Sequence, residues 1–580
     1  MTNTNAAFTE RSAGHLMVEQ LVREGVERVY SVPGESFLDI LDGLYDAPIT
    51  NVVARHEGGA GFMALAEARL TGRPGVVMVT RGPGAANAMI AVHTAYQDQT
   101  PLVMFVGLIP IADRNRESFH EFDPHAWFGS TAKKVLVLDD PDSAGELVSD
   151  AMRTAAGGRP GPVIIGVPED VLTVPTDAPA LDPRPLPAPA ISADALAGVR
   201  TAIAEAERPV VVVGGDGWHD GCGADLAAWC AAHGVPVTSD FRAYDAIPAS
   251  SPAWVGSLGY GRSDALAADV DAADLLVFIG AVRSDVLSDG YTRGLQARTI
   301  VIDPDPGLLG HTGRVDLHIQ ASPAAIVPAL TAEAPDASGA EAAPAATASG
   351  AEARRTRLER MRSEHEAFST ARPANHPAAG AAGAHAGVDL HALMREFDRQ
   401  VDGQAVVTYG AGNHALWPPR FIRHEQPSSL VAPRNGAMGV GIPAAVAAGL
   451  VHPDRTVISV AGDGCFMMNG QEIATAVGYG AKMVVVVIDN GIFATIVEHQ
   501  ERQYPQRPSG THLTNPDFAM MAQSYGLHGE TVRTSDDIAG AVERALASPT
   551  GALLHVITDP ALRGPSGEVP AAADSNGAHA

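Results

Sequence analysis

The sequence predicts an α/β protein built from three doubly wound parallel-sheet domains, the first and third pseudo-symmetric and the middle one Rossmann-like. Three observations predict this class. The chain has 580 residues, more than one hydrophobic core supports. Short β-branched runs alternate with amphipathic helical stretches, which is typical of a parallel sheet covered by helices. One long pattern occurs in the first third of the chain and again in the last third.

Strand patterns and breaks in composition divide the chain into segments. Residues 1–180 form a predicted first domain, with strands such as ITNVVA, GVVMVT and LVMFVG. A Pro-rich run follows, and residues 190–330 form a central domain with strands such as RPVVVV, DLLVFIG and RTIVID. Residues 331–387 are rich in Ala and Gly around one charged helix, so we expect a surface connector with little core. Residues 388–565 form a third domain, and residues 566–580 a disordered tail.

Charge and composition exclude several classes of protein. Lys and Arg total 40 against 67 for Asp and Glu, and the net charge of −27 repels nucleic acids and anionic membrane surfaces. The start lacks a signal-peptide pattern, and no apolar run is long enough to span a membrane, so we expect a cytoplasmic protein. Cys222, Cys230 and Cys465 lack CxxC spacing, which predicts free thiols in a reducing compartment.

The internal repeat relates the first domain to the third. RHEGGAGFMALAEARL begins at Arg55 and RNGAMGVGIPAAVAAGL begins at Arg434, each followed by a strand, a Gly-x-Gly turn and a helix. In these turns Gly82-Pro83-Gly84 corresponds to Gly462-Asp463-Gly464. Two similar sheets are therefore expected, with ligands at the carboxyl ends of their strands.

The strongest local motif is GDGCFMMNGQEIATAVGYGAKMVVVVIDN. Asp463 and Asn490 each follow a buried strand, so both side chains can reach the same point at a sheet edge. Carboxylate and amide oxygens suit Mg²⁺, which needs few protein ligands when a diphosphate supplies others. The glycines of the turn and the helix start after it allow backbone N–H groups to approach phosphate oxygens.

This motif resembles the signature of the thiamine-diphosphate enzymes. The resemblance implies that Asp463, Asn490 and the main-chain carbonyl of Ile492 hold the metal ion. Members of the family usually have two consecutive Asn at the end of the second strand. The first of these is Asp489 in this chain, and the second, Asn490, is the implied ligand.

The same resemblance implies roles for residues elsewhere. Glu57 matches the carboxylic acid that hydrogen-bonds the pyrimidine ring and activates the cofactor, and Met438 matches the apolar wedge that bends it. The alternatives are a solvated helix cap for Glu57 and an ordinary core position for Met438. The further cofactor contacts that it implies are Pro33, Gly82, Asn87, Asn413, His414, Gly436, Gly462, Gly464 and Cys465.

Within this family, VTRGPGAAN, GNHALW, GAMGVGIPAA and NPDFAMMAQSYG resemble the acetolactate synthase large subunit. The resemblance implies a 2-oxoacid decarboxylase and carboligase that uses Mg²⁺, works through ylide and enamine intermediates on small 2-oxoacids or aldehydes, and forms at least a homodimer. The substrate positions differ from that group. The candidates for substrate contacts are Phe119, His120, His499 and Gln500, with His56 as a further proton donor. The family has an Arg that binds the substrate carboxylate. In this chain its position is taken by Val286 or, if a gap is allowed, by Arg283.

Three questions stay open at this stage. A lyase for 2-hydroxy ketones or 2-hydroxyacyl thioesters, similar to benzaldehyde lyase, is an alternative function. A non-catalytic protein with the same fold is another. The central domain of relatives binds FAD, ADP or nothing, and the turn GGDGWHDGCG lacks the G-x-G-x-x-G spacing of a dinucleotide site.

Overall fold

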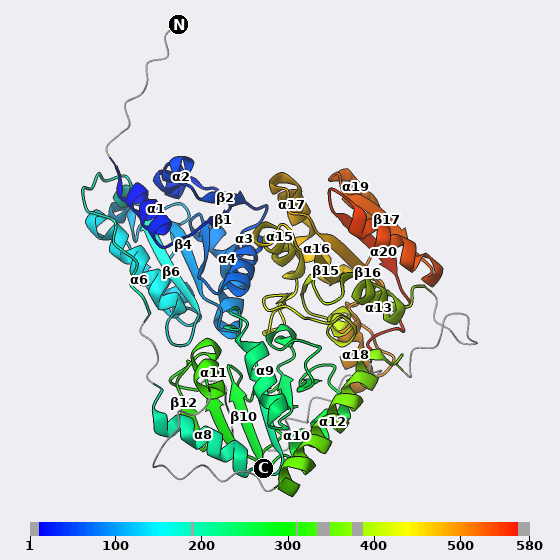
Figure 1. Cartoon of the computed structure of the whole chain (residues 1–580). Coiled ribbons are helices and arrows are strands. Elements are labelled where there is room, and N and C mark those ends of the chain that lie inside the picture. Colours follow the sequence, from blue (N-terminus) through cyan, green and yellow to red (C-terminus); the bar gives the residue numbers. More distant parts are fainter. Residues whose placement is uncertain are drawn as a thin grey trace. The chain divides into compact units, whose positions relative to one another are not determined.

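The computed structural model contains three parallel six-stranded sheets (Figure 1). It describes residues 11–186, 191–308, 311, 313–332, 348–373 and 387–565. The chain divides into two compact units: the first comprises Met1–Ala68 and Arg73–Pro187, and the second comprises Arg69–Gly72 and Ala188–Ala580. The first unit holds one sheet and the second unit holds two.

The sheet of the first unit has the strand order β2-β1-β3-β4-β6-β5. Its strands β3, β4 and β6 are buried along their whole length, as expected for a parallel sheet with helices on both faces. The strands are β1 (Arg28–Ser31), β2 (Thr50–Val53), β3 (Gly75–Val79), β4 (Leu102–Leu108), β5 (Lys134–Val137) and β6 (Pro162–Pro168). The main helices are α1 (Ala13–Arg23), α2 (Leu38–Asp46), α3 (Glu57–Thr71), α4 (Gly82–Asp98) and α6 (Ala144–Ala156).

The third sheet repeats the first, with the order β14-β13-β15-β16-β18-β17. Its strands are β13 (Val406–Tyr409), β14 (Leu430–Val431), β15 (Val457–Gly462), β16 (Val484–Asp489), β17 (His528–Val532) and β18 (Ala552–Ile557). Its helices are α13 (Leu390–Val401), α14 (Pro418–Phe421), α15 (Gly441–Val451), α16 (Asp463–Asn469), α17 (Ile473–Tyr479), α18 (Ala494–Gln503), α19 (Phe518–Ser524) and α20 (Ile538–Ala547). Each strand occupies the place of its counterpart in the first sheet, which confirms the predicted pseudo-symmetry.

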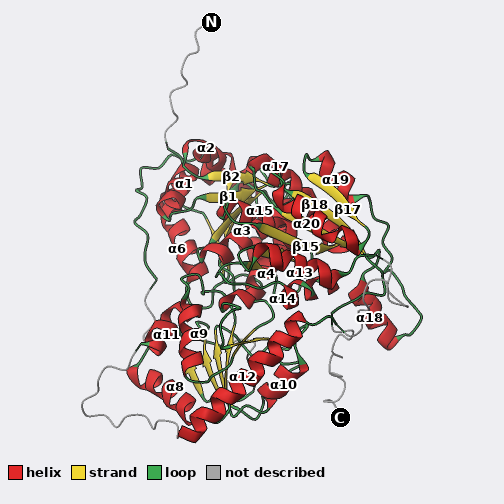
Figure 2. Cartoon of the chain, turned by 45° about the vertical axis from the view of Figure 1, so that its right-hand side comes forward, coloured by secondary structure: helices red, strands yellow, loops and turns green. Residues whose placement is uncertain are grey.

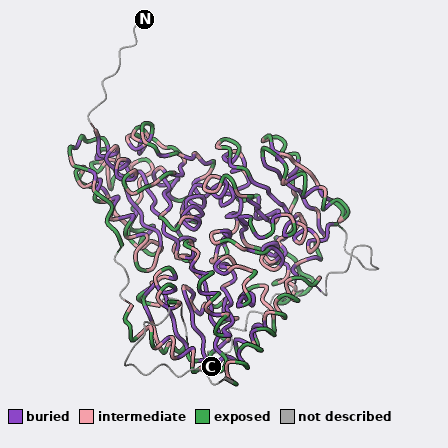
Figure 3. Tube along the Cα trace, in the orientation of Figure 1, coloured by how far each residue is buried: buried purple, intermediate pink, exposed green. Residues whose placement is uncertain are grey.

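The central sheet has the order β12-β11-β10-β7-β8-β9, which is the strand order of a Rossmann fold read from the other edge. Its strands are β7 (Pro209–Val213), β8 (Val237–Ser239), β9 (Trp254–Ser257), β10 (Leu275–Ile279), β11 (Arg298–Ile302) and β12 (Leu317–Ile319). Helices of this domain are α8 (Ala193–Glu205), α9 (Cys222–Ala232), α10 (Asp264–Asp271) and α11 (Pro323–Thr331). The strands of all three sheets are largely buried (Figure 3).

The charged helix α12 (Ala348–Thr370) packs on the central domain beside α10 (Figure 2). Leu358 and Met361 lie on one face of the helix and are buried in the core that covers β7 and β10. Arginines on the same side donate to main-chain carbonyls: Arg354 to Ile203 at 2.9 Å and Arg362 to Trp254 at 3.0 Å. The composition of this segment predicted little core, but the structure shows that α12 adds two buried side chains to the core of the central domain.

None of the described helices has both the length and the apolar character that a membrane span requires. The predicted tail, residues 566–580, and most of the predicted connector on either side of α12 lie outside the described residues.

The contacts of α12 predict that it stabilises the central domain. Arg354→Leu removes charged hydrogen bonds to three carbonyls at the end of α8, and such bonds contribute about 2 kcal/mol. We expect a melting temperature lower by about 5 °C in calorimetry. Arg355 is exposed on the same helix, so Arg355→Leu is the matched control and should melt with the wild type. Equal melting of both variants would contradict the role of Arg354.

Candidate functional site

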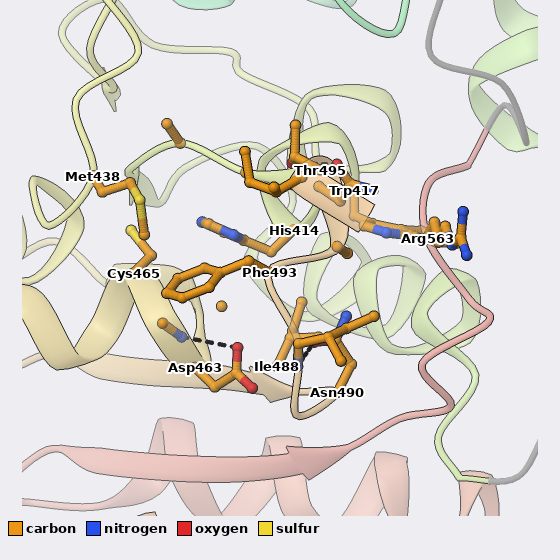
Figure 4. A pocket seen from close by; sticks show the side chains of 18 of the residues that line it. His414, Trp417, Met438, Asp463, Cys465, Ile488, Asn490, Phe493, Thr495 and Arg563 are labelled. Atoms are coloured by element: carbon orange, nitrogen blue, oxygen red, sulfur yellow. Dashed lines mark hydrogen bonds between the residues drawn. The ribbon is translucent and has the colours of Figure 1, made fainter. Parts of the chain in front are cut away.

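A cavity of about 270 Å³ lies at the carboxyl edge of the third sheet (Figure 4). Its walls come from the segments that follow β13, β14, β15 and β16, because parallel strands all end at this edge. The cavity brings together every residue of the third domain that the sequence predicted as a cofactor or metal contact: Asn413, His414, Gly436, Met438, Gly462, Asp463, Gly464, Cys465, Asn490 and Ile492.

Asp463 is the first residue of α16, directly after β15. One carboxylate oxygen, Oδ1, accepts a hydrogen bond from Gly464 N at 2.8 Å. The other, Oδ2, accepts from Gly491 N at 2.9 Å and from Asn515 Nδ2 at 2.8 Å. A carboxylate has about four acceptor positions, so capacity for one more ligand is left. Burial raises the pKa of Asp463 to about 6, and a cation bound beside it would favour the ionised form.

Asn490 follows β16, the neighbour of β15, and lines the same cavity. Its Oδ1 accepts from Ile492 N at 3.2 Å. Gly491 between them has a φ of +68°, a left-handed conformation that lets the chain turn sharply at the strand end. The turn places an amide oxygen and the main chain of Ile492 at the wall that Asp463 also lines.

Asp489 adds a second carboxylate beside this site. His555 Nε2 lies 2.9 Å from its Oδ2, and Asn515 Nδ2 donates to its Oδ1 at 2.8 Å. Burial raises the pKa of Asp489, but the hydrogen bonds from His555 and Asn515 outweigh this and lower it overall. Asn515 therefore joins the carboxylates of Asp489 and Asp463 through one amide group.

Asn413 and His414 follow β13 and line the same cavity. His414 is buried, and its Nε2 has no hydrogen-bond partner among the described residues. Burial, and to a lesser extent Arg242, lower the pKa of His414 to about 3, so the ring is neutral at physiological pH. Asn413 Nδ2 donates to Glu498 Oε1 at 2.8 Å, and its Oδ1 accepts from Thr495 Oγ1 at 2.6 Å. A buried polar nitrogen without a partner marks a place where a ligand atom can bind.

Met438 lies next to Cys465 at one end of the cavity, with the ring of Phe493 between them and Asp463 (Figure 4). Gly436 and Gly439 flank it with φ values of +75° and +82°. Gly439 N donates to Cys465 Sγ at 3.2 Å. These contacts attach the loop of Met438 to the start of α16.

In the first unit, Glu57 begins α3 after β2 and is 9% exposed. Asn87 Nδ2 donates to Glu57 Oε2 at 2.9 Å, so two predicted contacts meet directly. Gly82 N donates to His120 O at 3.2 Å, which brings a substrate candidate to the same edge. Phe119 is 73% exposed and stacks on His120, with ring centroids 3.6 Å apart, and Pro33 is exposed after β1.

The other substrate candidates lie apart from the cavity lining. His499 is exposed on α18, and Gln500 Nε2 donates to Ser509 O at 2.9 Å. Arg283 is fully buried in the central domain, where Nη2 donates to Gly294 O at 3.1 Å and to Thr299 Oγ1 at 3.2 Å. Its guanidinium therefore belongs to the packing of that domain.

Sequence reasoning missed several residues of the site. Phe493, Thr495, Trp417 and Arg563 line the cavity, and Asn515 supports Asp463 from behind. Two of these residues had a usable signal: Trp417 ends the quoted motif GNHALW, and Asn515 begins the quoted motif NPDFAMMAQSYG. Arg563 follows the last strand in a segment without any recognisable pattern.

Models of one protein family match all three domains. Residues 11–127 match the model described as "Thiamine pyrophosphate enzyme, N-terminal TPP binding domain". Residues 196–330 match the central domain of the same enzymes, and residues 410–556 match their C-terminal TPP binding domain.

Curated relatives extend over nearly the whole chain. The probable acetolactate synthase large subunit of Methanocaldococcus jannaschii is 30% identical over 559 residues, which cover 94% of this chain and 91% of the relative. Acetolactate synthase isozyme 2 large subunit of Escherichia coli is 28% identical, over 94% of this chain and 95% of its own. A probable acetolactate synthase 2 of Oryza sativa subsp. japonica is 30% identical, over 96% and 84%. The chain therefore belongs to the thiamine pyrophosphate enzymes, whose cofactor is also called thiamine diphosphate.

Proposed function

We propose that this chain is a thiamine-diphosphate- and Mg²⁺-dependent enzyme that decarboxylates a 2-oxoacid and joins the remaining acyl unit to a second carbonyl compound. One observation carries the proposal: Asp463, Asn490 and the unpartnered Nε2 of His414 line one cavity at the edge of the third sheet. The names of the relatives, acetolactate synthases, support the same reaction class.

Each group has a proposed role. Asp463, Asn490 and the carbonyl of Ile492 hold Mg²⁺, and Asn413 and His414 bind the diphosphate. Among the described residues, no group of three or more His, Cys, Asp or Glu side chains is placed to hold a metal ion by itself. This suits Mg²⁺, which takes its remaining ligands from phosphate and water.

When bound, thiamine diphosphate would supply a nucleophilic carbon and an acceptor for the electron pair of the bond that breaks. Glu57 would hold a proton at its pyrimidine ring nitrogen, with the carboxyl group oriented by the 2.9 Å hydrogen bond from Asn87. Met438 would pack against the cofactor as the apolar contact. Phe119, His120, His499 and Gln500 remain candidates for substrate contacts.

A second candidate function is cleavage of 2-hydroxy ketones or 2-hydroxyacyl thioesters. Two observations favour it. The guanidinium of Arg283 is buried and donates to Gly294 and Thr299. The other residue at the position of the family's Arg is the apolar Val286. Neither therefore offers a guanidinium to a substrate carboxylate. A non-catalytic role is disfavoured because Glu57, Asp463 and Asn490 are all present.

Product analysis separates these functions. We expect the enzyme loaded with thiamine diphosphate and Mg²⁺ to convert pyruvate to acetolactate and CO₂, measured by mass spectrometry. A panel of 2-hydroxy ketones tests the cleavage reaction in parallel. Aldehyde products from the panel without acetolactate from pyruvate would favour the lyase, and no product with either would reject both.

We also propose that the chain works in the cytoplasm as a homodimer or larger homo-oligomer, without nucleic acid or membrane partners. Exposed apolar side chains on α16 and α17 support an interface, since Met467, Met468 and Val477 are 52%, 50% and 47% exposed. The net charge of −27 supports the exclusion of polyanionic partners. Light scattering should give at least twice the mass of the 60.0 kDa chain.

FAD is left out of the proposal. The glycine-rich turn of the central domain is closed by the chain's own groups, because Trp218 Nε1 donates to Gly214 O at 2.9 Å.

The role of Glu57 predicts a specific kinetic effect. Glu57→Gln cannot hold the proton, so we expect kcat to fall by about 10²- to 10⁴-fold. Calorimetry should show nearly unchanged binding of thiamine diphosphate, because the diphosphate and metal contacts remain. Glu146→Gln replaces an exposed carboxylate of the same unit and should leave kcat at the wild-type value. Unchanged turnover in Glu57→Gln would exclude the assignment.

The contacts of Asn515 predict a change in metal affinity. Asn515→Leu removes the amide that donates to both Asp463 and Asp489. Loss of a residue that orients a metal ligand lowers the metal affinity by about 10- to 100-fold. The measurement is Mn²⁺ binding by electron paramagnetic resonance in the presence of thiamine diphosphate. Gln503→Leu, at an exposed amide on α18, is the control. If both variants bind Mn²⁺ equally well, Asp463 does not depend on Asn515.

A further inference from the structure

Side chains of the central domain hold the segment that leads into the loop of Met438. Asp245 Oδ2 accepts from Ser429 N at 2.9 Å and from Leu430 N at 3.1 Å, at the start of β14. Arg242 Nε donates to Pro433 O at 3.2 Å. Contacts to residues 429, 430 and 433 thus attach this stretch of chain to the segment that follows β8 in the central domain.

The last contact of this series is an ion pair. Arg434 Nη2 lies 2.8 Å from Asp216 Oδ1, and the two side chains are 13% and 17% exposed. Arg69 Nε lies 3.3 Å from the same oxygen. Burial raises the pKa of Asp216, but Arg434 and Arg69 together outweigh burial and the net pKa is lowered, so the carboxylate is ionised. Loss of Asp216 removes a partner from two covered arginines, whereas loss of Arg434 leaves Asp216 with Arg69.

Beyond Arg434 the chain continues into the loop of Met438. Asn435 Oδ1 accepts from Ala437 N at 3.0 Å, a contact within the loop. A Cβ at Gly436 would have no atom of the described chain within 4 Å. At the end of the loop, the carbonyl of Gly439 accepts from Asn469 Nδ2 at 3.0 Å. Met438 is therefore positioned from two sides, by α16 and by the central domain.

Asp216 lies in the turn GGDGWHDG after β7, where a Rossmann-like domain would bind the phosphates of a dinucleotide. This turn is closed. Trp218 Nε1 donates to Gly214 O at 2.9 Å, and a Cβ at Gly215 would lie 2.3 Å from Gly280 O of the neighbouring strand end. The acidic side chain of the turn, Asp216, would also repel a phosphate. The residues present do not fit FAD here.

We infer that the glycine-rich turn after β7 is an intramolecular docking site, in which Asp216 holds Arg434 and so positions the loop of Met438. The inference rests on the proposed role of Met438 at the cofactor. It makes Asp216 and Arg434 positioning residues, and it gives the central domain a structural role at the active site in place of dinucleotide binding.

The test compares Asp216→Asn, Arg434→Gln and the double variant, each loaded with thiamine diphosphate and Mg²⁺. A misplaced reacting group costs about 10²-fold in rate, so we expect each single variant to lose about that factor in kcat with little change in KM. The double variant should lose no more than Asp216→Asn alone, because Arg434 acts through Asp216. The near-ultraviolet circular dichroism of the bound cofactor should change in all three.

Controls make the outcomes separable. Arg544→Gln breaks an exposed pair with Glu530 in the same domain and should match the wild type. Arg434→Lys keeps the charge and should recover part of kcat. If the wild type fails to bind thiamine diphosphate, the proposed function fails. If it binds, and Asp216→Asn and Arg434→Gln match it in kcat and in circular dichroism, only the docking inference is overturned.

Equilibrium dialysis of the wild type with FAD needs no variant and stays informative even if the substitutions unfold the protein. We expect no retained flavin absorbance. Stoichiometric binding of FAD that is lost on Trp218→Gly or Asp216→Asn would place the flavin in the turn and overturn the inference.

Discussion

The site depends on the fact that adjacent parallel strands end at the same edge of a sheet. β15 and β16 are neighbours in register, so the residues that follow them, Asp463 and Asn490, line one cavity although a helical segment separates them in the sequence. A shift by one residue in either strand would turn its terminal polar side chain to the opposite face. The relative position of Asp463 and Asn490 is thus set by the pairing of two buried strands.

An extra acid modifies this arrangement. Asp489 stands where the family usually has Asn, and two carboxylates next to each other repel. Asn515 donates to both of them at 2.8 Å, and His555 from β18 lies against Asp489. The additional carboxylate of Asp489 thus has two hydrogen-bond partners, Asn515 and His555, from segments that follow β16 in the sequence.

Local patterns made much of this predictable. The repeated turn pattern predicted two related sheets, and the two strand ends predicted that Asp463 and Asn490 meet. The other residues of the third sheet that share the cavity came from the resemblance to thiamine-diphosphate enzymes. Partners distant in sequence could not be found in this way. Asn515 and His555 meet Asp489 only through tertiary packing, and Arg434 meets Asp216 only because two domains adjoin. The segment around α12 is rich in charged residues, so its composition did not predict that Leu358 and Met361 pack into the core of the central domain.

The position of α12 has a consequence for how the central domain can be isolated. The chain leaves this domain after α11, yet Leu358 and Met361 complete the core over β7 and β10. A recombinant fragment that stops near Ala332 would expose that apolar face to solvent and leave the carbonyls at the end of α8 without their arginine donor. The smallest soluble piece must therefore extend through Thr370.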